Sequence, residues 1–167
     1  NPLRVDWFHL GADIQQSIPT TGVQSNAEEV LEKLRLAPSF LMVGTLEPRK
    51  GYMQTIEAFS WLWQQGYHVN LVIVGAEGWK GYSDSMRRTI PRIMERLRNH
   101  PELGKQLIWL DGISDEYLEK IYAESTCLIA ASEGEGFGLP LIEAAQHHMP
   151  ILARNIPVFQ EVAGPHA

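Results

Sequence analysis

The sequence predicts an α/β fold built on a doubly wound parallel sheet. Short apolar runs of strand length recur along the chain, and stretches with helical spacing of apolar residues separate them. Strands that alternate with helices in this way favour parallel pairing through helical crossovers. Ligands of such sheets bind at the carboxyl ends of the strands, so the loops that follow the strands are where function is expected.

Five strands are expected from the apolar runs. Each run is short, rich in aliphatic residues and flanked by turn-forming residues, which is the pattern of a strand buried on both faces. The runs are FLMVGT, VNLVIVG, LIWLDG, TCLIAA and PILAR, at residues 40–45, 69–75, 107–112, 126–131 and 150–154.

Two helices with clear apolar stripes are expected between the first three strands. The stripe of the first is formed by Tyr52, Ile56, Phe59 and Trp63, and that of the second by Met86, Ile90, Ile93 and Leu97. Gly66 ends the first pattern. Pro91 lies inside the second pattern, so we expect it to kink or restart that helix.

Two further helices are expected at residues 115–124 and 139–148. Asp115 and Glu116 occupy the first turn of the earlier one, where the positive end of the helix dipole favours acidic side chains. Pro140 occupies the first turn of the later one, a position that tolerates proline because no backbone donor is lost there.

Residues 1–38 are predicted to be an incoming linker or hinge segment, and residues 39–167 the folded domain. The first segment is rich in turn formers, and only Ala27 to Leu36 has helical character, which we interpret as a short helix outside the core. Because the chain begins with Asn1 and Pro2 and has no signal-like pattern, we expect it to be part of a longer polypeptide.

Composition narrows the class of protein. The chain has 167 residues, 44% of them hydrophobic, and a net charge of −6, which argues against a nucleic-acid partner. Cys127 is the single cysteine, so a disulfide framework is excluded and a reducing compartment such as the cytoplasm is expected. Five arginines cluster in one stretch, and we interpret them as a solvated helix face: Arg87, Arg88, Arg92, Arg96 and Arg98.

The loop ASEGEGFGLPLIEAA, at residues 131–145, carries the strongest functional signal. Its glycines permit a close approach of backbone to ligand, and the helix that begins near Leu139 directs free N–H groups into the same crevice, which favours a phosphate. Glu135 and Glu143 would suit sugar or ribose hydroxyls, since carboxylates accept hydrogen bonds from hydroxyl pairs. The alternatives are two solvated glutamates or a dinucleotide site, although the loop lacks G-x-G-x-x-G spacing.

At this point the sequence resembles a known family. EGFGLPLIE contains the E-x7-E motif of retaining glycosyltransferases with the GT-B fold, in the form usual for glycosyltransferase family 4. VGTLEPRKG, LVIVG, GISDEYLEKIYA and RNIPVFQEVAG are similar to the same family and occur in the expected order. The resemblance covers about residues 39 to 164. It implies that residues 39–167 are a Rossmann-like nucleotide-sugar-binding domain, one half of a GT-B enzyme whose acceptor-binding half is missing.

The resemblance implies roles for individual residues. Glu135 would bind hydroxyls of the transferred sugar, and Arg49 and Lys50 would stabilise the leaving diphosphate; these three are the candidate catalytic residues. Many family members have arginine where Thr45 stands, which leaves Arg49 to compensate. The candidate donor-binding residues are Gly44, Gly75, Gly112, Ile113, Gly136, Phe137, Gly138, Leu139 and Glu143, of which Glu143 would hold the ribose and Gly112 and Ile113 the base.

The expected function is donor binding for hexose transfer. No Asp-X-Asp motif occurs, so we predict no metal and no cofactor; the donor would be a nucleoside-diphosphate sugar, with GDP-mannose as our interpretation. The partner would be a glycan or lipid-linked acceptor held by the missing half, which would also make any peripheral contact with the inner face of the membrane. A non-catalytic nucleotide-sugar binding module and a sugar-nucleotide epimerase remain the alternatives.

Overall fold

A computed structural model describes residues 22–164 and contains five strands and seven helical segments in that range. In chain order these are α1 (Ala27–Leu36), β1 (Ser39–Val43), the 3-10 turn η2 (Pro48–Lys50), α2 (Tyr52–Gln64), β2 (Asn70–Val74), α3 (Ile90–Arg98), β3 (Leu107–Leu110), α4 (Asp115–Glu124), β4 (Cys127–Ala130), α5 (Leu139–Gln146), β5 (Ile151–Ala153) and α6 (Pro157–Ala163).

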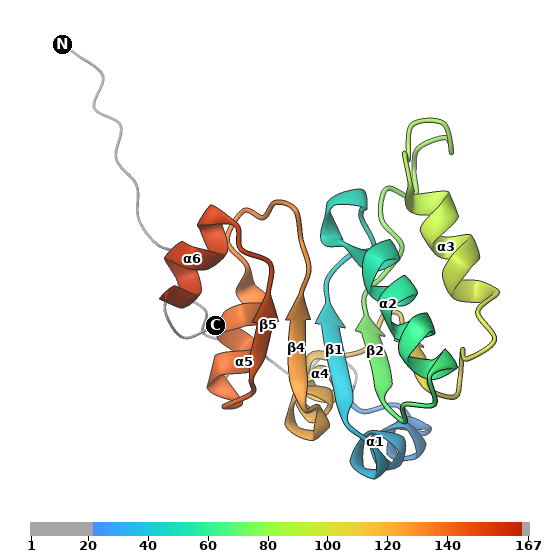
Figure 1. The fold of residues 1–167 in the computed structure, drawn as a ribbon, viewed down its shortest axis with the longest axis vertical. Helices are drawn as coiled ribbons and strands as arrows, with labels where there is room; N and C mark the ends of the chain where they lie inside the picture. The colour runs from blue at the N-terminus through green and yellow to red at the C-terminus, as the bar shows by residue number, and fades with distance from the viewer. Residues whose placement is uncertain (1–21, 165–167) are drawn as a thin grey trace.

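The five strands form one parallel sheet with the order β3-β2-β1-β4-β5. The register pairs Ser39 with Asn70 at the start of β1 and β2, and Leu128 with Ile151 at the start of β4 and β5. All carboxyl ends lie at one edge, which is the upper edge in Figure 1. The predicted doubly wound α/β fold is therefore confirmed; β2 to β5 are shorter than their apolar runs, and β1 begins one residue earlier than predicted and ends two residues earlier.

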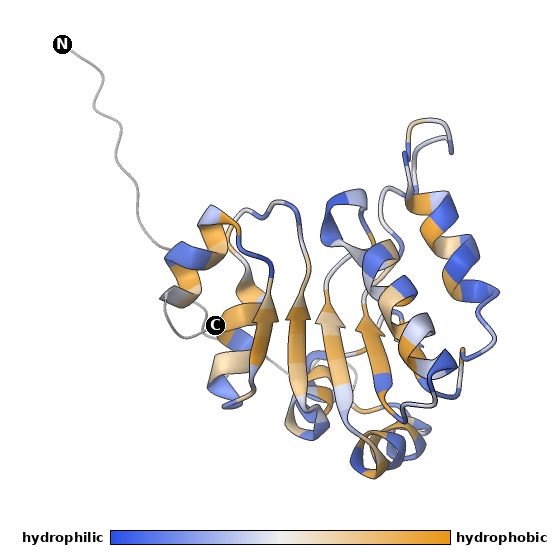
Figure 2. Cartoon of the chain, in the orientation of Figure 1, coloured by the Kyte–Doolittle hydropathy of each residue, from blue (hydrophilic) through white to orange (hydrophobic). Residues whose placement is uncertain are grey.

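Side chains that alternate along the strands fill two separate cores, one on each face of the sheet. On β2, which is buried throughout, Val72 and Val74 pack toward α1, α4, α5 and α6, whereas Leu71 and Ile73 pack toward α2 and α3. Apart from the polar residues that begin β1 and β2, the strands are mostly hydrophobic, whereas hydrophilic and hydrophobic residues are mixed along the helices (Figure 2). This explains why the strands appear in the sequence as continuous apolar runs.

The helix α1 belongs to the core, so the expectation that residues 27–36 lie outside it is wrong. Leu31 and Leu34 are buried against the sheet, and α1 packs beside α4. The amide of Asn70, buried at the start of β2, donates to the carbonyl of Lys33 at 3.0 Å and to Ser39 Oγ at 3.0 Å. These bonds join the end of α1 to the amino edge of the sheet. The expected linker at residues 1–21 lies outside the described residues.

Two other helices differ from expectation. The second apolar stripe begins at Ile90 and not at Met86: Met86 lies in a turn and is exposed, and Pro91 occupies the first turn of α3. Proline thus restarts the helix at the position where its missing donor costs nothing. The helix α6 was not predicted, because its seven residues contain too few apolar positions for a periodic pattern; Phe159 is its buried anchor.

The sheet face toward α2 and α3 is only partly covered. Both helices lie over β1, β2 and β3, whereas β4 and β5 on that face border an open groove of about 460 Å³ lined in part by Phe40, Phe59, Ile129 and Leu152. Leu152 is 61% exposed although it lies in a strand. Within residues 22–164 no helix is long and apolar enough to cross a membrane.

We predict that Leu34→Ala lowers the free energy of unfolding by about 2–5 kcal/mol, because it leaves a cavity between α1 and the sheet. Leu36→Ala is the matched control. Leu36 is 85% exposed on the same helix, so its loss should change stability by about 0.5 kcal/mol or less. Urea unfolding of both variants measures the difference. Equal effects would mean that α1 is not part of the cooperative fold.

Candidate functional site

The loops after β1 and β4 meet at the carboxyl edge of the sheet. The N–H of Glu133 donates to the carbonyl of Arg49 at 2.7 Å, which joins the two loops through their backbones. Gly51 has a φ of +75°, and a Cβ there would lie 2.5 Å from the carbonyl oxygen of Ala131. Only glycine fits this contact, so Gly51 sets how closely the two loops approach.

Glu135 lies at the centre of the site. One carboxylate oxygen accepts a hydrogen bond from Lys50 Nζ and another from Ser132 Oγ at 2.8 Å; the second oxygen accepts from Arg49 Nη1 at 2.7 Å. The Glu135 side chain is 10% exposed and that of Lys50 14%, whereas that of Arg49 is 45% exposed. The three residues predicted as catalytic are therefore brought together in one ion-pair cluster.

The surroundings of Glu135 hold it in the charged form. Burial raises the pKa of this carboxyl, but the hydrogen bonds from Lys50, Arg49 and Ser132 outweigh burial and leave the pKa below its ordinary value. The hydrogen bond to Glu135 likewise raises the pKa of the Arg49 guanidinium. Glu47 also pairs with Arg49, so the two cations are matched by two carboxylates, and an anionic ligand would replace these internal partners of Lys50 and Arg49.

Gly44 and Gly75 form the floor beside this cluster. A Cβ on Gly44 would lie 3.2 Å from Lys50 Nζ, and a Cβ on Gly75 would lie 1.9 Å from the carbonyl oxygen of Gly44. Tyr52 donates its hydroxyl to that same carbonyl at 2.5 Å. The loop glycines after β1 and β2 thus contact one another, and their lack of side chains makes room for the ammonium of Lys50.

The glycine-rich loop leads directly into α5. Gly138 precedes this helix with a φ of +88°, and a Cβ there would lie 2.9 Å from Cε1 of Phe159 on α6. A small cavity of about 20 Å³ beneath the loop is bordered by Lys50, Glu135 and Gly138. Gly136 and Leu139 are exposed and Phe137 is half-buried, so the loop presents both backbone and side chains to solvent above the cluster.

Glu143 is held separately from this cluster. Tyr122, on α4, donates its hydroxyl to Glu143 Oε2 at 2.5 Å and stacks on His147 with ring centroids 5.3 Å apart. Burial raises the pKa of Glu143, and the bond from Tyr122 opposes this rise only in part. In the described part of the chain, no contact joins Glu143 to Glu135, although the sequence motif pairs them.

Gly112 and Ile113 follow β3, at the same edge but on the far side of β2 from the Glu135 cluster. Gly112 is exposed with a φ of +66°, and Ile113 packs against the core. Their position beside a ligand stays a prediction. Among residues 22–164, no group of three or more His, Cys, Asp or Glu side chains is arranged to hold a metal ion.

Three polar residues of the site were not predicted. Ser132 was hidden in the glycine-rich loop, although it follows β4 directly, where site residues are expected. Tyr52 and Tyr122 look like members of apolar helix stripes, and their rings are indeed buried in the two cores. Their hydroxyls nevertheless reach Gly44 and Glu143. The one signal in the sequence is a tyrosine in an apolar stripe, because the hydroxyl of a buried tyrosine usually requires a hydrogen-bond partner.

The fold and the cluster define a Rossmann-like domain of the kind found in GT-B glycosyltransferases. Residues 26–167 match the family "Glycosyl transferases group 1", and the chain belongs to this family. The resemblance recognised in the sequence is thereby confirmed.

The curated relatives are mannosyltransferases. The chain is 53% identical over its whole length to the "Serotype-specific mannosyltransferase WbdA" of Escherichia coli, of which it covers 20%. It is 30% identical over 137 residues, 82% of the chain, to the "O-antigen chain mannosyltransferase RfbU" of Salmonella typhimurium, of which it covers 35%. The chain thus spans only about a fifth to a third of the length of these relatives.

Solved structures support the fold. The C-terminal domain of the glycosyl transferase group 1 family protein LpcC from Francisella tularensis matches 86% of this chain and 70% of its own, with a TM-score of 0.59 at 21% identity. A glycosyltransferase from Rickettsia africae matches 89% of this chain and 36% of its own, with a TM-score of 0.60 at 25% identity.

We predict that Glu135→Gln lowers the free energy of unfolding by about 1–3 kcal/mol at pH 7, because Lys50 loses a charged partner in a mostly buried place. The pKa of Glu135 is lowered from its ordinary value of 4.5 by folding. Its charged form therefore adds stability above about pH 4.5, and this contribution is lost as the pH falls through the lower folded value. The difference between wild type and variant should shrink accordingly between pH 5 and pH 3.

Glu133→Gln is the control for this experiment. Glu133 lies in the same loop, but its side chain is 54% exposed and 3.8 Å from Arg154, so its stability difference should be small at every pH. Urea midpoints across the pH series measure both variants. A Glu135→Gln difference that does not depend on pH would contradict a charged carboxylate in the cluster.

Proposed function

We propose that this chain is the donor-binding domain of a retaining mannosyltransferase that uses a nucleoside-diphosphate sugar without a metal. The observation that carries the proposal is the cluster of Arg49, Lys50 and Glu135 at the carboxyl edge of a parallel sheet. Two cations beside the start of α5 suit a diphosphate, since both guanidinium and ammonium form strong charge-assisted bonds to phosphate oxygens.

The donor would bind by replacing an internal partner. Both Arg49 and Lys50 donate hydrogen bonds to the carboxylate of Glu135 in the structure. A diphosphate that accepts bonds from Lys50 and Arg49 frees the carboxylate of Glu135 to accept hydroxyls of the sugar. The phosphate and the sugar are then recognised by linked groups, with backbone N–H groups of Gly136, Phe137 and Gly138 in support.

The nucleoside would extend away from this cluster along the sheet edge. We assign the ribose hydroxyls to Glu143, whose carboxylate already accepts one hydroxyl bond, from Tyr122. The base is assigned to Gly112 and Ile113 after β3, and Gly75 lies between the two places in the sheet order. Leu139 opens the helix whose N–H groups meet the phosphates.

In the transfer step, the bond between the anomeric carbon and the β-phosphate oxygen breaks on the same face on which the acceptor hydroxyl attacks. The acceptor proton passes to the departing phosphate oxygen, and the nucleoside diphosphate leaves. Lys50 and Arg49 stabilise the charge that develops on that oxygen, which is their catalytic contribution. No side chain of this chain acts as a covalent nucleophile, and the acceptor is held elsewhere in the protein, so these residues alone bind without turnover.

The relatives guide the choice of donor and setting. Their names, "Serotype-specific mannosyltransferase" and "O-antigen chain mannosyltransferase", lead us to propose GDP-mannose as donor, a growing glycan or lipid-linked acceptor, and polysaccharide biosynthesis as the process. The single cysteine fits the proposed cytoplasmic location at the inner face of the membrane.

Calorimetric titration of the 167-residue chain tests the proposal. GDP-mannose and GDP should bind in EDTA, UDP-glucose should bind more weakly, and added Mg²⁺ should change none of the three affinities. A strict magnesium requirement, or no binding of any nucleoside diphosphate, would contradict the proposal.

A transfer assay on the longer protein tests the alternatives. Transfer of labelled mannose from GDP-mannose distinguishes an enzyme from a non-catalytic binding module, and conversion of the donor sugar in the absence of an acceptor would reveal an epimerase.

We predict that Lys50→Ala weakens GDP binding about 10- to 150-fold, the equivalent of one charge-assisted bond of about 1.5–3 kcal/mol. Guanosine, which carries no phosphate, should bind both proteins with the same affinity. Lys120→Ala, on the exposed surface of α4, is the control and should leave GDP binding unchanged. An equal loss for GDP and guanosine would mean that Lys50 supports the fold or the base and not the diphosphate.

A further inference from the structure

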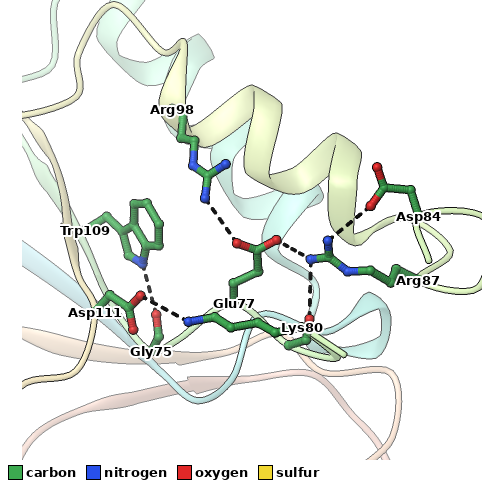
Figure 3. A network of polar contacts seen from close by, with 9 residues as sticks. Gly75, Glu77, Lys80, Asp84, Arg87, Arg98, Trp109 and Asp111 are labelled. Carbon is green, nitrogen blue, oxygen red and sulfur yellow. Dashed lines mark hydrogen bonds and ion pairs between the residues drawn. The ribbon is translucent and has the colours of Figure 1, made fainter. Parts of the chain in front are cut away.

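Glu77, which follows β2, is the centre of a second network at the same edge of the sheet. Its Oε1 pairs with Arg87 Nη2, and its Oε2 pairs with Arg98 Nη2 at 3.1 Å (Figure 3). We call Glu77, Arg87 and Arg98 the Glu77 clamp. The side chains of Glu77 and Arg87 are only 16% and 11% exposed, so this is not a loose surface pair.

The expectation that these arginines form one solvated helix face is therefore wrong for Arg87. Arg87 precedes α3, and it also bonds to Asp84 Oδ1 at 3.2 Å. Hydrogen bonding to Glu77 raises the pKa of Arg87, and the bond from Arg87 lowers the pKa of Glu77 although burial opposes it. Glu77 and Arg87 thus hold each other in the charged form.

The clamp is attached to the rest of the sheet through Arg98 and β3. The Arg98 guanidinium lies 6.0 Å from the ring centroid of Trp109, a cation–π distance. The indole N–H of Trp109 donates to the carbonyl of Gly75 at 2.9 Å, as Figure 3 shows. Arg98 thus links Glu77 to the ring of Trp109, which is itself bonded to the backbone two residues before Glu77.

The backbone on either side of Glu77 holds the loop after β1. Leu46 donates its N–H to the carbonyl of Ala76 at 2.8 Å, and its own carbonyl accepts the N–H of Gly78 at 3.2 Å. A Cβ on Gly78 would lie 2.7 Å from that carbonyl, so the two segments are in close contact. The segments that follow β1 and β2 are therefore paired by backbone hydrogen bonds on either side of Glu77.

Leu46 is fully buried, and the turn that carries Arg49 and Lys50 begins two residues later. This turn is closed by a hydrogen bond from the N–H of Lys50 to the carbonyl of Glu47 at 3.2 Å. Glu47 also pairs with Arg49 Nε at 3.1 Å. The position of Leu46 therefore determines where the two cations of the Glu135 cluster lie.

We propose that Glu77 is a positioning residue for Arg49 and Lys50. In the part of the chain that the structure describes, the Glu77 side chain has no hydrogen bond or ion pair with Arg49, Lys50 or Glu135. It instead holds residues 76–78 in place, and the backbone of these residues bonds to Leu46, just before the turn that carries Arg49 and Lys50. The expected effect on nucleoside-diphosphate binding rests on the proposed function. The structural link from the Glu77 clamp to the turn at Pro48–Lys50 does not depend on any ligand.

Glu77→Gln, which keeps the size of the side chain but removes its charge, should weaken GDP binding by the 167-residue chain about 3- to 30-fold. Guanosine binding should change less than about twofold, because coupling through the turn acts on the phosphates. Asp84→Asn is the matched control: Asp84 pairs with the same Arg87, but its side chain is 78% exposed and does not contact the segment 76–78 through any hydrogen bond found in residues 22–164. It should leave both ligands unaffected.

A second readout needs no ligand. Amide hydrogen exchange at Leu46 and Lys50 should be faster in Glu77→Gln than in wild type or Asp84→Asn, and Arg98→Gln should show the same change to a smaller extent. If wild type binds no GDP, the proposed function fails, and the exchange rates still decide the link. Unchanged exchange at Leu46 and Lys50, or an equal loss of GDP and guanosine binding, would overturn the positioning role. Arg98, which is 56% exposed, also provides a variant that should fold if Glu77→Gln does not.

Discussion

The pairing of Glu135 with Lys50 and Arg49 is the interaction on which the architecture of the site depends. A carboxylate that is 10% exposed is costly to bury unless charge-assisted hydrogen bonds replace its water, and here three side chains supply them. Lys50 and Arg49 lie 85 and 86 residues before Glu135 in the sequence, so the charge pair holds together the carboxyl ends of β1 and β4. Close glycine contacts allow the same edge to pack tightly: Gly51 lies against Ala131 after β4, Gly75 against the backbone of Gly44, and Gly138 against the ring of Phe159.

Two ion-pair networks lie at the carboxyl edge of the sheet. In the Glu135 cluster, Lys50 and Arg49 share Glu135, and Arg49 also pairs with Glu47. In the Glu77 clamp, Arg87 and Arg98 share one largely shielded carboxylate, and the backbone of Leu46 connects the two networks. Glu135 and Glu77 both have a lowered pKa for the same reason: hydrogen bonds from cationic side chains outweigh the opposing effect of burial. Although the chain has an overall charge of −6, both networks place cations at the edge where an anion is expected.

Periodicity predicted the sheet and its direction, because strands buried on both faces leave a local pattern. It also predicted that the loops after the strands meet at one edge, whereas Arg49, Lys50 and Glu135 were singled out there by the resemblance to the family. The sequence could not indicate features that arise only from packing. α1 looked like a linker because its contacts depend on Asn70, more than thirty residues away, and on α4. Arg87 looked solvated because it was assigned to a helix face, whereas it lies before α3 and pairs with Glu77, ten residues earlier in the same segment between β2 and α3. Tyr122 looked like a core residue because its hydroxyl bond to Glu143 spans two helices.

The open face of β4 and β5 affects how the stability of this chain should be understood. Each strand of a parallel sheet has two sides to shield from water, and β5 shields one, with Leu152 left 61% exposed in a groove of about 460 Å³. Covering one leucine is worth about 1.5–3 kcal/mol, and the groove has several other apolar walls. A free energy of unfolding measured on these residues alone is therefore a lower bound. A segment of a longer polypeptide that packed on this face would raise the free energy of unfolding without contacting the residues at the carboxyl edge.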